Sequence, residues 1–305
     1  MSRRYVILDV FTDRPLAGNP LAVVLDSEGL DTDSMQAIAR EFNMSETVFV
    51  AEPESPRHRA RMRIFTPARE LPFAGHPTVG AAVLLGLEED AAQGGGAGGA
   101  DAQAFGLEQR IGVVSCVVET VGEGRGRARF KVPRTPEYLG PAPDSARLAW
   151  ALGLQPDDIG FARHVPSRHS AGVAFDFVPV GSLEALAKAW PGVGFPEVFE
   201  GDHPAAYVYA ALTAGDGQRF RARMFAPGLG VAEDPATGSA AAAFAGMLMQ
   251  SEPLGDGVHD FVIEQGFDMG RPSLIDLQLS IDGGALSSVE IGGGAVVVAR
   301  GELLL

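Results

Sequence analysis

The sequence predicts an α+β protein of two similar halves, each a curved, mostly antiparallel sheet around one apolar helix. Many strand-like runs are separated by turn residues, which favours a sheet-rich fold. Two helical segments carry no charge and are apolar on every face, so both must be buried all round. A strand, a loop and a Pro-initiated helix follow one another in each half, which indicates an internal repeat.

Runs rich in β-branched and aromatic residues predict the strands. In chain order they cover residues 5–10, 21–25, 46–50, 59–65, 111–120, 128–132, 205–211, 220–225, 274–281 and 295–299. In Thr32–Phe42 the apolar residues recur at helical spacing, which predicts a surface helix with one buried face. The two apolar helices are predicted over residues 76–87 and 235–249, with Pro77 and Pro235 in the first helical position.

Two short motifs recur at a nearly constant offset. RMRIFTP at residues 61–67 returns as RARMFAP at 221–227, and GHPTVG at 75–80 returns as EDPATG at 233–238. The repeat implies two pseudo-symmetric domains with a site at their interface. The segment 88–103 is rich in Gly and Ala and is predicted to be a flexible surface loop.

Composition limits the class of protein. The length of 305 residues suggests two domains, and 24 basic against 39 acidic residues give a net charge of −15, which disfavours nucleic-acid and membrane partners. The single cysteine, Cys116, allows no internal disulfide and fits a cytoplasmic setting. The first residues do not resemble a signal peptide and no apolar stretch reaches membrane-spanning length, so we expect a soluble, cytoplasmic protein.

Two residues of the first half could carry chemistry. Glu46 opens an apolar strand, where burial would raise its pKa and make it a proton acceptor near neutral pH; a solvent-facing strand end fits the alternation as well. His76 precedes Pro77 at the start of a buried helix. It could transfer protons or position a ligand there, or it could serve only as a cap or packing residue.

The start of the second apolar helix repeats this arrangement. Asp234 is predicted to be its N-cap, a role that Asp often fills. The first turn adds the hydroxyls of Thr237 and Ser239 and, through Gly238, close access to the backbone. Two helix N-termini at a domain interface would form a pocket for a small carboxylate, between Gly75–Thr78 and Thr237–Ser239.

Other chemistries find little support in the sequence. The six histidines show no metal-binding spacing, so no metal is predicted. Ser239 does not lie in a nucleophile-elbow motif, which argues against acyl-enzyme chemistry. The glycine-rich segment 88–103 lacks the lysine and the helix start of a phosphate-binding loop, and no cofactor is predicted.

Four motifs in a fixed order carry a resemblance to a known family. They are DVFTDRPLAGNPLAVV at 9–24, NMSETVFV at 43–50, FTPARELPFAGHPTVGAA at 65–82 and EDPATGSAA at 233–241. From Val6 to about Gly270 the chain resembles the phenazine biosynthesis PhzF-like family. The resemblance implies the diaminopimelate epimerase-like fold, with residues 1–130 and a returning C-terminal strand in 287–305 as one domain and residues 131–286 as the other.

The resemblance also implies roles for particular residues. Glu46 would be the general acid/base, supported by His76 and Asp234. Diaminopimelate epimerase has a cysteine at each buried helix start, where this chain has His76 and Asp234, so a two-thiol mechanism is excluded. The candidate substrate-binding residues are Asn19, Ser45, Gly75, Thr78, Thr237, Gly238 and Ser239. A homodimer is expected on the resemblance alone.

We therefore expect a cofactor-independent isomerase in which Glu46 moves a proton between carbons of a small carboxylate, of the trans-2,3-dihydro-3-hydroxyanthranilate isomerase type. The carboxylate would be a cyclic amino- or hydroxy-acid, and the sequence does not assign it further. Two alternatives stay open. One is a carboxylate-based amino-acid racemase or epimerase, and the other is a partner-binding protein that keeps a relic cleft.

Overall fold

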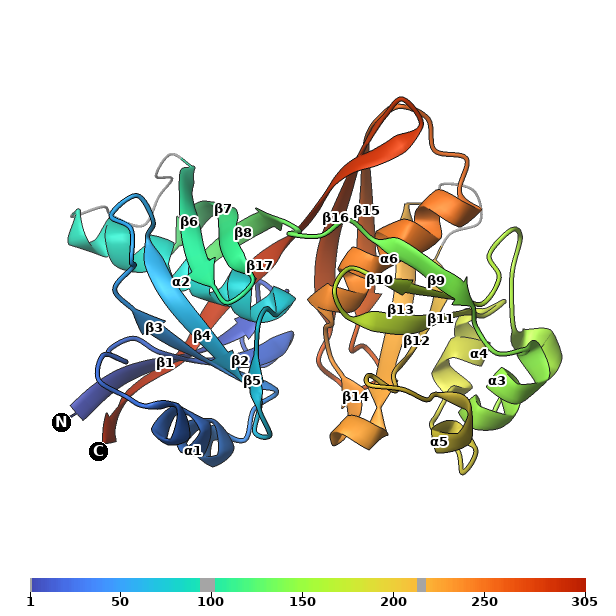
Figure 1. Ribbon diagram of the computed structural model, residues 1–305, viewed down its shortest axis with the longest axis horizontal. Helices are drawn as coiled ribbons and strands as arrows, with labels where there is room; N and C mark the ends of the chain where they lie inside the picture. The colour runs from blue at the N-terminus through green and yellow to red at the C-terminus, as the bar shows by residue number, and fades with distance from the viewer. Residues whose placement is uncertain (1, 94–101, 213–217) are drawn as a thin grey trace. The chain divides into compact units, whose positions relative to one another are not determined.

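The computed structural model describes residues 2–93, 102–212 and 218–305, and the chain divides into two compact units. The first unit comprises Met1–Pro133 and Gly292–Leu305, and the second comprises Arg134–Ile291. Each unit combines a sheet with helices (Figure 1), so the predicted α+β class is confirmed.

A closed ring of strands forms the first unit. The strands pair in the order β1 (Ser2–Val10), β2 (Asn19–Val24), β3 (Glu46–Ala51), β4 (Ala60–Phe65), β6 (Gln103–Gln109), β7 (Gly112–Gly122), β8 (Arg125–Lys131) and β17 (Ala285–Leu304), and β17 pairs with β1. Most neighbours are antiparallel, whereas β2/β3 and β4/β6 are parallel. The short strand β5 (Glu70–Leu71) pairs with the end of β4. The ring leaves an interior that a helix can fill.

That helix is α2 (Gly75–Ala92), which packs against β1, β2, β3, β7 and β8. Its residues 75–86 are buried, as the apolar sequence predicts. Gly80 permits the close approach, because a Cβ there would lie 2.6 Å from Leu21 Cδ2. The prediction of a loop over residues 88–103 is wrong at its start, because α2 continues to Ala92. Glu89, in the last turns of this helix, pairs with Arg59 at 2.9 Å. Residues 94–101 of that loop lie outside the described residues.

Helix α1 (Thr32–Phe42) has the bounds that the sequence predicts, because both of its ends are capped locally. The Asp31 carboxylate accepts the Ser34 N–H at 2.8 Å, and Asn43 adopts the left-handed conformation at φ 49°. The helix buries its apolar face against residues of β2, β3 and β4.

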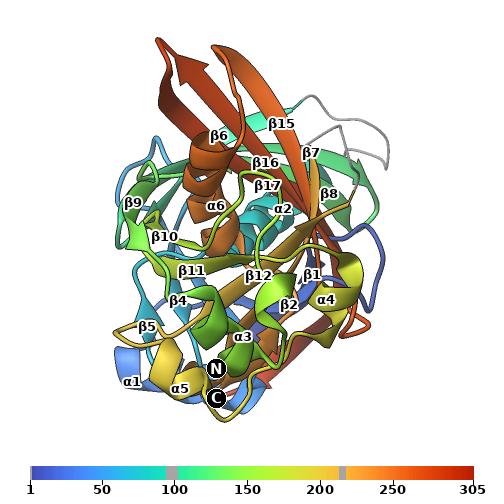
Figure 2. The same cartoon turned by 90° about the vertical axis from the view of Figure 1, so that its right-hand side faces the viewer.

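The second unit repeats the strand order of the first. The strands pair in the order β9 (Glu137–Pro141), β10 (Ser167–Ser170), β11 (Ala174–Pro179), β12 (Ala206–Ala211), β13 (Arg219–Ala226), β15 (Gly257–Gln265), β16 (Ser273–Asp282) and the first part of β17. Again two pairs are parallel, β11/β12 and β13/β15. The buried helix is α6 (Gly238–Ser251), which packs against β9, β10, β11 and β16 (Figure 2).

Several elements of the second unit have no counterpart in the sequence-based prediction. They are α3 (Ser145–Leu152), α4 (Leu183–Lys188), α5 (Phe195–Val198), the 3₁₀ turns Pro156–Asp158 and Pro227–Leu229, β9, β10, β11 and β14 (Val231–Asp234). β6 and β15 were missed as well. β10 shows the reason, because it buries Ser167, His169 and Ser170 between two partner strands and has no hydrophobic alternation.

Strand β17 belongs to both units and is much longer than the predicted strand at 295–299. Its second part pairs antiparallel with β1, from Val10 opposite Ala295 to Ser2 opposite Leu304. The two chain ends therefore lie side by side, as Figure 1 shows.

Candidate active site

Three candidate side chains meet inside the first unit. Asn19 begins β2 and Glu46 begins β3, and because these strands are parallel both residues lie at the same end of the ring. His76 lies in the first turn of α2. Its Nε2 is 3.4 Å from Glu46 Oε2, and its Nδ1 is 3.5 Å from Asn19 Nδ2. The fold thus brings together the acid/base candidate, the histidine and one candidate binding residue.

The contact with Asn19 determines which imidazole nitrogen carries the proton. Asn19 Nδ2 is a donor only, so Nδ1 of His76 must accept. In a neutral imidazole the proton then resides on Nε2, which faces the Glu46 carboxylate. The Nε2–H group therefore lies beside the Glu46 carboxylate, although this contact does not have hydrogen-bond geometry.

Burial keeps His76 neutral. The side chain is 5% exposed, and burial lowers the pKa of the imidazole to about 3. At neutral pH the approach to Glu46 is that of a neutral N–H to a carboxylate rather than an ion pair. The Glu46 side chain is 17% exposed, so its carboxylate is largely withdrawn from water.

The buried neutral imidazole predicts a pH-dependent stability. Below pH 6.5 the unfolded chain binds a proton at His76 that the folded chain takes up only near pH 3, so stability falls as pH falls through this window. Between pH 6.5 and 5 the loss should be about 2 kcal/mol, from about 1.4 kcal/mol per pH unit. Urea unfolding at both pH values should show a loss smaller by this amount in His76→Asn. Equal losses in the two proteins would contradict the prediction.

Three other candidates lie near these residues in the chain. Ser45 is half-buried directly before β3, and Gly75 is buried at the start of α2. The Thr78 hydroxyl donates to the Ala74 carbonyl at 2.8 Å and accepts from Gln109 Nε2 at 3.0 Å. Thr78 therefore stabilises the helix start, and its hydroxyl proton is already used.

Contrary to the sequence-based prediction, Asp234 is not the N-cap of the second apolar helix. It ends β14, where it pairs with Met224 of β13, and the N-cap of α6 is Thr237. The prediction of Asp234 as N-cap with Pro235 at N1 is wrong, because hairpin pairing keeps Asp234 extended and a residue before proline disfavours the helical region. The Asp234 carboxylate instead accepts from the Thr237 hydroxyl at 2.6 Å.

The sequence-based prediction missed Gln265, which contacts this helix start. Gln265 Nε2 donates to the Asp234 carbonyl at 2.8 Å and to Thr237 Oγ1 at 2.9 Å, and its Oε1 accepts the Thr237 N–H at 3.2 Å. Gln109 takes the corresponding place in the first unit. The repeated tripeptides LEQ at 107–109 and IEQ at 263–265 were the signal that could have found both.

The two remaining candidates form the first turn of α6. Gly238 is buried and Ser239 is partly exposed. Both follow Thr237, whose N–H is already bound to Gln265, so the next backbone N–H groups are the donors that this helix start can offer to a ligand.

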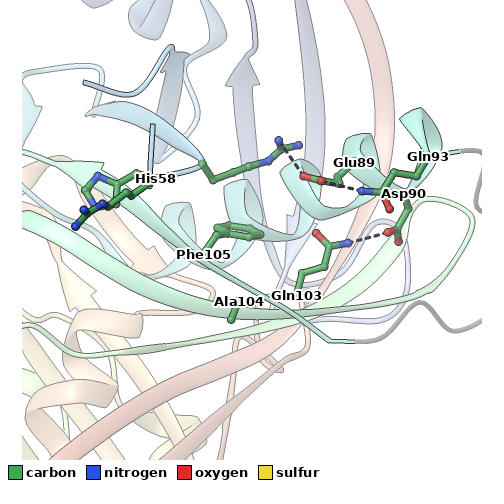
Figure 3. Close-up of a pocket in the computed structure, with 9 residues that line it drawn as sticks. His58, Glu89, Asp90, Gln93, Gln103, Ala104 and Phe105 are labelled. Atoms are coloured by element: carbon green, nitrogen blue, oxygen red, sulfur yellow. Dashed lines mark hydrogen bonds and ion pairs between the residues drawn. The ribbon is translucent and has the colours of Figure 1, made fainter. Parts of the chain in front are cut away.

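A separate hollow of about 530 Å³ lies on the first unit (Figure 3). Its lining residues are Arg57, His58, Arg59, Glu89, Asp90, Gln93, Gln103, Ala104 and Phe105, and none of them is a candidate site residue. Its polar groups bind one another, as in the contacts of Gln93 with Glu89 at 2.9 Å and of Gln103 with Asp90 at 2.7 Å. The hollow contains no candidate site residue and is therefore not the candidate active site.

Among the residues that the structure describes, no three His, Cys, Asp or Glu side chains are grouped so that they could hold a metal ion. Within the same residues, no helix combines the length and the apolar character that crossing a membrane requires.

A repeated sheet around a buried apolar helix defines an epimerase-like α+β protein, and in the first unit a carboxylate and a neutral imidazole lie at the helix start. The sequence pattern described as phenazine biosynthesis-like protein matches residues 8–301, and the chain belongs to this family. The chain is similar to an uncharacterized isomerase of Mesorhizobium japonicum, with 48% identity over 100% of this chain and 99% of that one.

Two further relatives support the same placement. Trans-2,3-dihydro-3-hydroxyanthranilate isomerase of Pseudomonas aeruginosa is 36% identical, with 99% of each chain covered. The crystal structure of a Bacillus anthracis phenazine biosynthesis protein of the PhzF family has a TM-score of 0.85 at 25% identity and covers 100% of both chains. The protein is thus an enzyme of the isomerase class, and the predicted family and epimerase-like fold are confirmed.

Proposed function

We propose that the protein is a cofactor-independent isomerase that moves a proton between two carbons of a small cyclic carboxylate, with Glu46 as general acid/base. The observation that carries this proposal is the neutral His76 N–H at 3.4 Å from the Glu46 carboxylate, at the start of a buried helix. A carboxylate that is withdrawn from water, with a neutral imidazole beside it rather than a cation, can act as a base toward a carbon-bound proton.

The reaction needs no other reactant. Glu46 takes a proton from one carbon, the electron pair of that C–H bond shifts the double bond, and the protonated Glu46 returns the proton to a second carbon. His76 lies beside Glu46 and remains neutral, since burial lowers its pKa to about 3. Backbone N–H groups at the starts of α2 and α6 are proposed to bind carboxylate groups.

The proposed substrate class follows from the relatives. A compound of the trans-2,3-dihydro-3-hydroxyanthranilate type is supported by 36% identity to the Pseudomonas aeruginosa enzyme that carries this name. Asp234 is proposed to support the reaction from the second unit, and Asn19, Ser45, Thr237 and Ser239 to bind substrate. A cytoplasmic location is proposed from the single buried cysteine, Cys116, and a homodimer from family membership.

The test uses trans-2,3-dihydro-3-hydroxyanthranilate itself. Purified protein in D₂O should convert it to an isomer with a displaced double bond, followed by proton NMR, without added metal or cofactor. Recovery of the starting compound with deuterium at an inverted carbon would instead identify a racemase or epimerase. If neither this compound nor cyclic amino acids exchange any proton, the proposal is wrong. That result would favour the alternative of a partner-binding protein with a relic cleft.

A further inference from the structure

We propose that Gln265 is a positioning residue for Asp234, which it orients through the Thr237 hydroxyl in a one-directional chain of hydrogen bonds. The chain runs from Gln265 Nε2 to Thr237 Oγ1 at 2.9 Å and from Thr237 Oγ1 to Asp234 Oδ2 at 2.6 Å. The importance of these hydrogen bonds for catalysis rests on the proposed function of Asp234. The hydrogen bonds themselves rest on the geometry of the second unit.

The direction of the chain follows from the donors available. Gln265 Nε2 has two protons, one for the Asp234 carbonyl and one for Thr237 Oγ1. The Thr237 oxygen thus accepts from Gln265, and its own proton is left for the Asp234 carboxylate. The reverse amide orientation would set Oε1 against the Asp234 carbonyl oxygen and the NH₂ group against the Thr237 N–H, so it is excluded.

Gln265 can act in this way because it is itself fixed. It is fully buried at 0% exposure, and its Oε1 accepts from the Thr237 N–H at 3.2 Å and from the Tyr207 hydroxyl at 3.4 Å. The next residue, Gly266, has φ +75°, and a Cβ there would lie 2.7 Å from the Pro235 carbonyl oxygen. A larger residue at this position would push the end of β15 away from the Asp234–Thr237 segment.

Other charged and titratable groups also surround Asp234. Tyr207 faces it from β12, and burial, followed by the charge of Asp234, raises the pKa of the phenol. On β14 the neighbouring Glu233 is bound to Arg223 of β13 at 2.8 Å. Arg223 is paired with Glu233 and also lies 3.9 Å from Asp268 Oδ2. The Thr237 hydroxyl donates directly to the Asp234 carboxylate.

The first unit lacks such a chain at the equivalent position. Gln109 Nε2 donates to Thr78 Oγ1 at 3.0 Å, but the Thr78 hydroxyl donates its hydrogen bond to the Ala74 carbonyl and not to a carboxylate. The two glutamines of the repeat thus stabilise two helix starts, and only Gln265 reaches an ionisable side chain. This asymmetry distinguishes a positioning role from a purely structural one.

The experiment measures the titration of Asp234 directly. The full chain is labelled with ¹³C-aspartate, and the Asp234 carboxyl signal is assigned by its loss in Asp234→Asn. Gln265→Glu places a second carboxylate beside Thr237 and Asp234, so the midpoint of the Asp234 titration should rise by about one pH unit or more. Thr237→Val removes the donor to the carboxylate and should shift the midpoint in the same direction, while Thr237→Ser should restore it.

The control is Gln278→Glu, the same change at a half-buried glutamine of β16 that donates to Asp260 at 2.7 Å. It should leave both the Asp234 midpoint and activity unchanged. Asp234 titration midpoints equal to wild type in Gln265→Glu and Thr237→Val would overturn the inference. If Gln265→Glu does not fold, the comparison of Thr237→Val with Thr237→Ser tests it. Activity of Asp234→Asn tests the proposed function separately, because the titration needs no substrate.

Discussion

Glu46→Gln should lower kcat on trans-2,3-dihydro-3-hydroxyanthranilate by about 10²–10⁴-fold, the usual contribution of a general base. The amide keeps the shape of the carboxylate and can occupy the same place, 3.4 Å from His76 Nε2. It has no basic site for a carbon-bound proton. Proton NMR spectra of the reaction at successive times give the rate. The thermal unfolding midpoint of the variant should stay close to that of the wild type.

The matched control is Glu41→Gln, the same change at an exposed position in α1. This variant should retain wild-type kcat and KM. A KM change alone in Glu46→Gln would assign Glu46 to substrate binding. Wild-type turnover by Glu46→Gln would remove it from the mechanism altogether.

Glu233→Gln should lower the free energy of unfolding of the second unit by about 3–5 kcal/mol, because it removes the carboxylate that is hydrogen-bonded to a buried guanidinium. The Asp268 carboxylate lies farther away, at 3.9 Å from Arg223 Nε. Arg223 and Glu233 side chains are each 6% exposed and form two hydrogen bonds, at 2.9 and 2.8 Å. The remaining Arg223 nitrogen donates to three backbone carbonyls, of Leu186, Ala187 and Ala189.

Both tryptophans, Trp150 and Trp190, lie in the second unit, so their fluorescence during urea unfolding reports on it. The repeat supplies the control. Arg63 and Glu70 form the equivalent pair in the first unit, at 2.7 and 2.8 Å, but the Arg63 side chain is 30% exposed and Glu70 has a second partner in Arg110. Glu70→Gln should cost no more than about 1 kcal/mol by circular dichroism. Equal costs for the two variants would show that burial does not set the difference.

Local chemistry made part of the fold predictable. Helix α1 has its predicted bounds because Asp31 and Asn43 cap it from adjacent positions. The burial of residues 75–86 of α2 and of α6 followed from their lack of charge. The repeat of Arg61–Pro67 in 221–227 marks strands β4 and β13, which take equivalent places in the two units. In each case the deciding interactions lie within a few residues or are read directly from apolar content.

The site was predictable as a set of residues but not as an arrangement. Glu46 and His76 stood out because each is a polar residue at the edge of an apolar segment. Their contact depends on two strands and a helix from separate parts of the chain, and the tautomer of His76 depends on Asn19, 57 residues away. No local pattern encodes such a pairing.

By itself, the sequence determined that this chain has two related halves, each with a buried apolar helix and polar residues near its start. Tertiary structure alone decided that Asp234 ends a strand and that Thr237 caps α6. It also decided that Gln265, from β15, directs the Thr237 hydroxyl toward Asp234. The physical reason is that apolar burial and local caps are properties of neighbouring residues, whereas strand pairing and buried hydrogen bonds join groups that only the folded chain brings together.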